Sequence, residues 1–153
     1  MSKPKIKFLR FYQIGAPAIR PRWYRLKERV YYGFRIDGVF VEMIFAPGAE
    51  WDGGSIPRFA WSVLGLAPGD ILAESLIHDA LCRIHREDWP KWFNLIVHNN
   101  SVKFLRLTPY IRDHLFRECM KKMGVLRRRA RIAWFCVVLK WRFECWKLGI
   151  KYK

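Results

Sequence analysis

The dipeptide Asp37-Gly38 places the strongest constraint on the fold of this chain. It lies between two runs rich in β-branched and aromatic residues, residues 31–36 and 39–45. Asp-Gly is a favoured loop of the two-residue β-hairpin, because both central residues of that turn need a positive φ. The pattern therefore predicts two antiparallel strands in a fixed register. Ala46-Pro47-Gly48 then ends the second strand.

Helical signals follow the hairpin over residues 71–85, 110–123 and 126–148. Asp70 is suited to cap the first of these helices, with Glu74 close to the capping-box position. Gly124 ends the second helix. Residues 1–30 include prolines at positions 17 and 21, which favours extended segments and loops. The sequence thus predicts an α+β fold, in which an N-terminal antiparallel hairpin or small sheet packs on three to five helices.

Charge is concentrated at the two ends of the chain. The net charge is +16 over 153 residues: residues 1–35 carry +9 and residues 121–153 carry +10, whereas residues 36–120 carry −3. Basic ends favour an acidic protein partner or assembly, nucleic acid, or an anionic membrane surface. The longest uncharged apolar run, residues 132–139, is far shorter than the roughly 20 residues of a transmembrane helix. We therefore expect no transmembrane segment.

The cysteines indicate a reducing compartment. Cys82, Cys119, Cys136 and Cys145 show no CxxC spacing, and the N-terminus lacks the apolar segment of a secretory signal. We expect reduced, buried thiols and a location in the cytoplasm of the producing cell.

Two short motifs concentrate most of the polar chemistry. The turn-forming segment contains Asp52, Gly53, Gly54, Ser55 and Pro57, and His78-Asp79 follows on the first predicted helix. Glycine and proline at these positions favour a tight turn that holds polar side chains in place. We expect this turn, the His-Asp pair and Asp113 of the second helix to lie together.

Three interpretations of this polar group remain open. Asp52, His78, Asp79 and Asp113 could ligate a divalent metal, since imidazole and carboxylate groups are common metal ligands. His78 and Asp79 could act as an acid–base pair. The same residues could also be structural, with Asp52 and Ser55 capping the turn and the helix after it.

These motifs also carry a resemblance to a known family. The chain resembles DUF1353, a family of short bacterial and bacteriophage proteins of unknown function, in Phe45-Ala46-Pro47-Gly48, Trp51 to Arg58, His78-Asp79-Ala80-Leu81 and Arg112-Asp113-His114-Leu115-Phe116. The resemblance covers about residues 40–125 of a single domain, 1–153, and leaves segments 1–35 and 126–149 as basic extensions. It implies a phage or prophage origin. Cys82 departs from the family, which more often has an aromatic residue there.

The last predicted helix interleaves basic and aromatic residues. Trp134, Val138, Trp141 and Cys145 share one side at helical spacing, and the apolar face is widened by Ile132, Phe135, Leu139 and Phe143. Core packing explains this pattern, and so does an interfacial membrane helix. Nucleic-acid or acidic-protein binding is a further explanation, with a basic contact surface formed by Arg127, Arg128, Arg129 and Arg131.

Two functional hypotheses follow. In the first, the protein is a bacteriophage-encoded accessory protein, virion-associated or host-interacting, located in the host cytoplasm or the virion. Its polar residues then hold the fold, and its basic ends contact a partner. In the second, it is a metal-assisted hydrolase in which His78, Asp79 and Asp113, with Asp52, hold a divalent cation or transfer protons.

Overall fold

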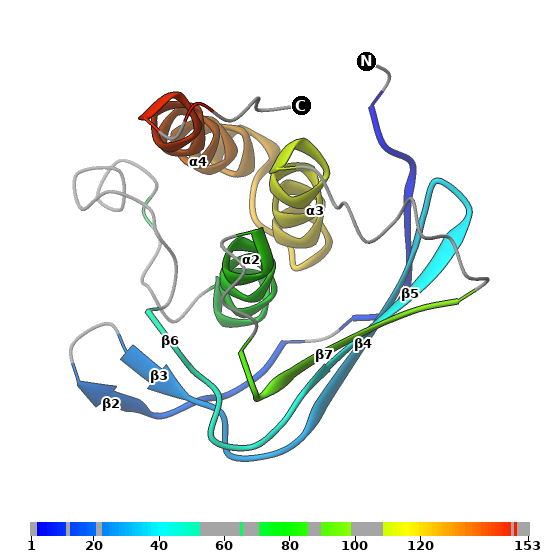
Figure 1. The fold of residues 1–153 in the computed structure, drawn as a ribbon, viewed down its shortest axis with the longest axis vertical. Helices are drawn as coiled ribbons and strands as arrows, with labels where there is room; N and C mark the ends of the chain where they lie inside the picture. The colour runs from blue at the N-terminus through cyan, green and yellow to red at the C-terminus, as the bar shows by residue number, and fades with distance from the viewer. Residues whose placement is uncertain are drawn as a thin grey trace.

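The computed structural model describes residues 3–11, 13–20, 23–52, 65, 71–85, 90–98, 109–147 and 149. Two antiparallel sheets and three helices make up this part of the chain, which confirms the α+β prediction (Figure 1). The strands are β1 (Ile6–Arg10), β2 (Ala18–Arg20), β3 (Trp23–Arg25), β4 (Val30–Ile36), β5 (Val39–Phe45), β6 (Glu50–Trp51) and β7 (Phe93–Val97). The helices are α2 (Leu72–His85), α3 (Pro109–Lys122) and α4 (Arg127–Lys147).

The predicted hairpin is confirmed as β4 and β5. Asp37 and Gly38 have φ values of 49° and 87°, as a two-residue turn with two positive φ angles requires. The strands pair from Val30 opposite Phe45 to Ile36 opposite Val39. The larger sheet has the order β1-β4-β5-β7, and the smaller one has the order β2-β3-β6.

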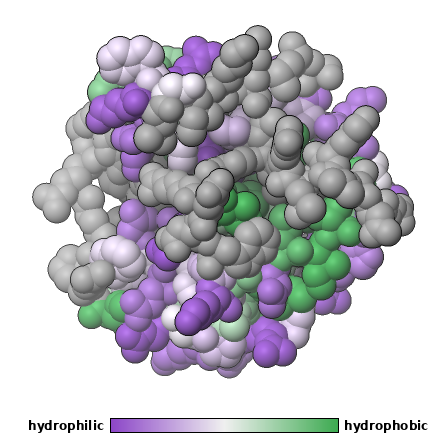
Figure 2. Space-filling view, viewed as in Figure 1, coloured by the Kyte–Doolittle hydropathy of each residue, from purple (hydrophilic) through white to green (hydrophobic). Residues whose placement is uncertain are grey.

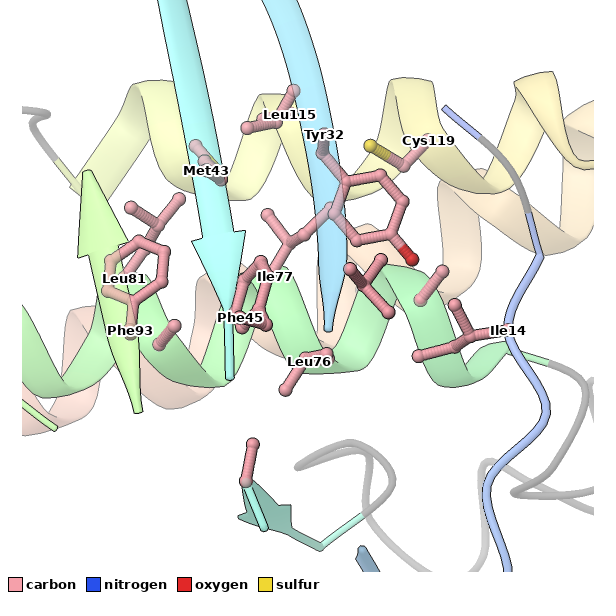
Figure 3. Packing of buried hydrophobic residues seen from close by; sticks show 14 of the residues in the cluster. Ile14, Tyr32, Met43, Phe45, Leu76, Ile77, Leu81, Phe93, Leu115 and Cys119 are labelled. Atoms are coloured by element: carbon pink, nitrogen blue, oxygen red, sulfur yellow. The ribbon is translucent and has the colours of Figure 1, made fainter. Parts of the chain in front are cut away.

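One face of the larger sheet forms the main hydrophobic core. Along β4, Tyr32, Phe34 and Ile36 are buried, whereas the alternate residues Tyr31 and Arg35 face solvent. Helix α2 lies across the buried face (Figure 1). Figure 3 shows side chains of α2 directed at the sheet, where they pack among Tyr32, Met43, Phe45 and Phe93. The sheet thus fixes one side of α2.

The other side of α2 faces a second core, which it shares with α3 and α4. Ala130, Ala133, Val137, Trp141 and Cys145 form the buried side of α4 in this cluster. Gly124, with φ of 87°, turns the chain from α3 into α4. The N–H of Val125 donates to Met120 O at 3.0 Å and that of Gly124 to Lys121 O at 3.2 Å, which satisfies the end of α3. Within the described ranges, no helix combines the length and apolar character needed to span a bilayer.

Candidate functional site

His78 and Asp79 point to different parts of the molecule. Consecutive residues on an α-helix are separated by about 100°, so adjacent side chains cannot share a direction. His78 contacts Asp113 of α3, whereas Asp79 pairs with Arg83 one turn along α2. The four residues predicted to converge therefore separate into two groups, and the structure brings His78 together with Asp113.

A buried polar network (Cys82, His78, Arg112 and Asp113) connects α2 to α3. His78 Nε2 lies 3.0 Å from Asp113 Oδ1, and Arg112 Nε donates to the same oxygen at 2.8 Å. Arg112 and Asp113 are fully buried, and His78 is 4% exposed. One oxygen of the Asp113 carboxylate thus contacts both the His78 imidazole and the Arg112 guanidinium in the protein interior. Hydrogen bonds are strong there, and an unpaired polar group is costly.

Arg112 is also held by an aromatic ring of α4. Its guanidinium carbon lies 4.1 Å from the centre of the Trp141 ring, which is a close cation–π contact. Arg112 Nη2 lies 2.7 Å from Asp113 Oδ1 as an ion pair, yet neither Nη atom has a hydrogen-bond acceptor in good alignment. The Trp141 ring and the Asp113 charge therefore offset the cost of burying this cation.

Cys82 completes the network on the other side of the imidazole. Its Sγ lies 3.6 Å from His78 Nδ1, one helical turn away. Burial by itself would lower the pKa of His78, but the Cys82 thiolate and the hydrogen bond to Asp113 raise it to about 9. Burial would raise the pKa of Cys82, and the charges of His78 and Arg112 bring it below its ordinary value instead. Each of the two groups thus favours the charged form of the other.

The order thiol, imidazole, carboxylate matches the nucleophile, base and orienting group of thiol enzymes. The thiol of such an enzyme is accessible to its substrate, whereas the thiol of Cys82 is buried. Cys82 is 8% exposed and lies in the second hydrophobic cluster beside Phe116 and Met120. The arrangement is that of a buried clamp between helices, and Cys82 contributes to its charge balance.

Asp79 belongs to a partly buried site near β6. Arg83 Nε donates to Asp79 Oδ2 at 3.0 Å. Burial raises the pKa of Asp79, the charge of Asp52 raises it further, and Arg83 opposes both effects. Asp52 and Asp79 therefore lie close enough to repel each other. Among the described residues, no three His, Cys, Asp or Glu side chains form a group that could hold a metal ion.

The predicted polar turn is described only at its start. Gly53, Gly54, Ser55 and Pro57 lie outside the described residues. Just before them, Trp51 Nε1 donates to Ser75 Oγ at 3.0 Å, and Ser75 Oγ donates to Leu72 O at 3.0 Å. This chain of hydrogen bonds ties β6 to the first turns of α2.

Asp70, the expected cap residue of α2, lies outside the described residues, and Glu74 does not have the capping-box role that its position indicated. Its side chain is fully buried, and neither carboxylate oxygen has a hydrogen-bond partner. Burial raises the pKa of Glu74 from 4.5 to about 7, and the residue's own backbone offsets only part of this effect. Near neutral pH the protonated form is thus substantially populated, which avoids leaving an unpaired charge in the core.

Three of the four predicted contact arginines lie around one open basic hollow. This hollow measures about 560 Å³ and is lined by Lys3, Arg117, Lys121, Arg127, Arg128 and Arg131. The fourth, Arg129, instead places Nη1 at 3.5 Å from Gly65 O. The hollow combines Lys3 of the N-terminal segment with residues of α3 and of the start of α4, which lie far from Lys3 in the sequence.

A second surface feature runs along α4. Phe135, Leu139, Phe143 and Trp146 form an exposed apolar stripe, with exposed fractions of 54%, 49%, 53% and 75%. Their spacings of four, four and three residues place them on one side of the helix. The sequence grouped Phe135, Leu139 and Phe143 with the residues around Trp141, but these three face solvent on the opposite side from the buried residues.

Basic residues border the exposed apolar stripe on both sides. At about 100° per residue, Arg131 and Arg142 lie along one edge, and Lys140 and Lys147 lie along the other. All four are exposed. Figure 2 shows pale and green side chains among purple hydrophilic ones at the upper left, where Figure 1 places α4. This helix therefore has two apolar faces, one packed on the protein and one directed to solvent.

Several of these residues were not identified from the sequence. Cys82 was named for its departure from the family but was not assigned to the polar site, although a residue four positions after His78 lies on the same helix face. Arg112 gave no such signal, since its burial depends on Trp141 from another helix. Trp146 was named only as part of the basic, aromatic C-terminus, yet it is the most exposed of the large apolar residues that the structure describes.

Comparison with known proteins identifies the family without adding an activity. Neither the curated proteins nor the solved structures contain a match to this chain. The family model described as "Protein of unknown function (DUF1353)" matches residues 24–137, from β3 into α4, and the chain belongs to that family.

Proposed function

We propose that this protein is a non-enzymatic accessory protein of a bacteriophage or prophage that docks on an anionic membrane surface of its host. The observation that carries the proposal is the exposed apolar stripe on α4 with basic side chains along both edges. An apolar face bordered by Lys and Arg is the typical composition of a helix that lies in the headgroup region of a bilayer.

The two parts of this surface would act together. A large apolar side chain gains about 1.5–3 kcal/mol when it leaves water completely. Each Lys or Arg near an anionic membrane contributes about 1 kcal/mol. The stripe residues are about half exposed or more, so a large part of their apolar area is still available for burial. Insertion and charge attraction are each modest, and their sum supports reversible binding.

The helices behind the stripe supply a rigid platform. Helix α4 packs on α3 through the second hydrophobic cluster, and Trp141 of α4 covers the Arg112 guanidinium. The buried polar network then fixes α3 against α2. In this proposal the His-Asp motif serves the fold, and α4 makes the contact.

The geometry gives less support to the metal-assisted hydrolase. A shared cation would require His78, Asp79 and Asp113 to point at one position. His78 and Asp113 face each other in the core, and Asp79 is directed to Arg83 and Asp52. This divergence favours the non-enzymatic proposal.

Co-sedimentation with vesicles tests the proposal. We expect binding to phosphatidylcholine vesicles that contain phosphatidylglycerol, and much weaker binding to phosphatidylcholine alone. The double variant Phe135→Ser/Phe143→Ser should bind about tenfold more weakly. The matched control is Leu9→Ser/Ile96→Ser, which removes two similarly exposed apolar side chains from the larger sheet and should bind like the unmodified protein.

Two outcomes would overturn the proposal. One is the absence of sedimentation with the anionic vesicles. The other is equal loss in the two double variants, which would mean that the stripe has no special role. The protein could instead fail to bind vesicles but bind an acidic protein or nucleic acid, with equal affinity in the Phe135→Ser/Phe143→Ser variant. The basic ends would then be assigned to that partner.

A further inference from the structure

The basic hollow lies at the N-terminal end of the helix that carries the exposed apolar stripe. Arg127, Arg128 and Arg131 line it from α4, while Arg117 and Lys121 line it from α3. Arg128 lies seven residues before Phe135, so it is on the same side of α4 as the stripe. The hollow and the stripe therefore form one continuous surface along α4.

Positive charge in the hollow is only partly compensated. Glu118 accepts from Arg117 Nη2 at 3.0 Å and from Lys121 Nζ at 2.5 Å, and these hydrogen bonds hold the pKa of Glu118 below its ordinary value although burial would raise it. Among the described residues, no carboxylate forms an ion pair with the other four, which are Lys3, Arg127, Arg128 and Arg131. In the part of the chain that the structure describes, one carboxylate is thus paired with members of a group of six cations.

The start of α4 adds backbone donors to this charge. The N–H of Ala130 donates to Leu126 O at 2.9 Å, which makes Leu126 the cap residue of the helix. A leucine side chain cannot accept from the free N–H groups of the first turn, and the first turn contains no acidic residue. The positive end of the helix dipole is therefore next to the arginines rather than neutralised.

We propose that the basic hollow binds the phosphate of an anionic lipid headgroup while the stripe enters the bilayer. This inference rests on the proposed function, since it names the chemical group recognised at the same surface. Arginine matches phosphate oxygens with paired N–H donors, and lysine adds a compact point charge. A volume of about 560 Å³, open to solvent, admits a headgroup from the membrane side.

The test compares two charge-matched variants of α4. Arg127→Gln/Arg128→Gln removes two cations from the hollow, and Lys140→Gln/Lys147→Gln removes two from the edge of the stripe. Each is measured for binding to phosphatidylcholine–phosphatidylglycerol vesicles. In a second arm, inorganic phosphate is titrated against the unmodified protein and against both variants by calorimetry. Circular dichroism verifies that each variant is folded.

We expect the hollow variant to bind vesicles about tenfold more weakly than the edge variant, although both have lost the same charge. Inorganic phosphate should bind the edge variant like the unmodified protein and should bind the hollow variant more weakly. Equal losses of vesicle binding would overturn the inference and leave the proposed function intact, because the cations would then act only as diffuse charge. If inorganic phosphate binds at the hollow and vesicles do not bind at all, the bound phosphate does not belong to a lipid headgroup. This result would overturn both the inference and the proposed function.

Discussion

His78 of α2 and Asp113 of α3 meet through a contact of 3.0 Å in the interior of the protein. The same Asp113 oxygen also accepts from Arg112 Nε at 2.8 Å. Because both partners depend on one buried carboxylate, its removal would leave the charges of His78 and Arg112 with only the Cys82 thiolate to balance them in the core. The contact therefore links the stability of α2, α3 and, through Trp141, α4.

Loss of the Asp113 carboxylate should destabilise the fold strongly. We expect Asp113→Ala to lower the free energy of unfolding by about 3–5 kcal/mol, the usual cost of breaking a buried ion pair on one side. The control is Glu50→Ala, which removes the exposed ion pair with Arg25 and should cost at most about 1 kcal/mol.

Chemical denaturation of the two variants provides the measurement. If Asp113→Ala does not fold, Asp113→Asn keeps the side-chain shape and should fall between Asp113→Ala and the unmodified protein. Equal stability of Asp113→Ala and the control would show that the buried contact contributes nothing.

The hairpin could be predicted because its determinants are local. Asp37 and Gly38 set the turn by their own φ angles, and the alternation of buried and exposed residues in β4 sets the face. Both effects depend only on residues within a few positions of each other, so they can be predicted from the local sequence. Helix α4 was predicted for the same reason, and its observed ends are within one residue of the expected ones.

The candidate site was harder to predict, because its geometry depends on how helices rotate against each other. Grouping His78 with Asp79 treated neighbours in sequence as neighbours in space, although adjacent helical residues diverge by about 100°. The face of α4 that became buried was likewise undetermined. Apolar residues occupy both of its sides, and only packing against α2 and α3 selects Ala130 and Trp141 over Phe135 and Phe143.

Replacement of Glu74 should remove a pH dependence of stability. The folded-state pKa of Glu74 is about 7, against 4.5 when it is unperturbed. Below about pH 4.5 the group is protonated in both states, so stability is complete. As the pH rises from about 4.5 to about 7, the unfolded state ionises first, and stability is lost. Glu74→Gln should therefore be more stable than the unmodified protein above pH 7, by about 3 kcal/mol.

The informative quantity is the difference in unfolding free energy between Glu74→Gln and the unmodified protein at each pH. This difference should be near zero below pH 4.5 and should grow to its full value by pH 7. Glu28→Gln, which makes the same change at an exposed position, is the matched control. A difference that is constant with pH would mean that Glu74 has the same pKa in the folded and unfolded states, and would contradict the prediction.

Removal of the Cys82 thiol should lower the pKa of His78. In the unmodified protein, the Cys82 thiolate at 3.6 Å and Asp113 together raise this pKa to about 9, although burial opposes them. Cys82→Ala deletes the thiolate, which is the larger of the two raising effects, and leaves burial in place. The imidazole of this variant should lose its proton at a lower pH, as followed by NMR of the ring protons.

Cys136→Ala, which removes a thiol from a partly exposed position on α4, is the control and should leave the His78 titration unchanged. The reciprocal change also follows from the pairing. His78→Gln should raise the pKa of Cys82, because burial then acts without the neighbouring imidazolium. Thiolate absorbance in the ultraviolet should therefore appear at a higher pH. An unchanged His78 titration in Cys82→Ala would exclude the charged thiolate–imidazolium pair and would leave Asp113 as the partner that sets the protonation of His78.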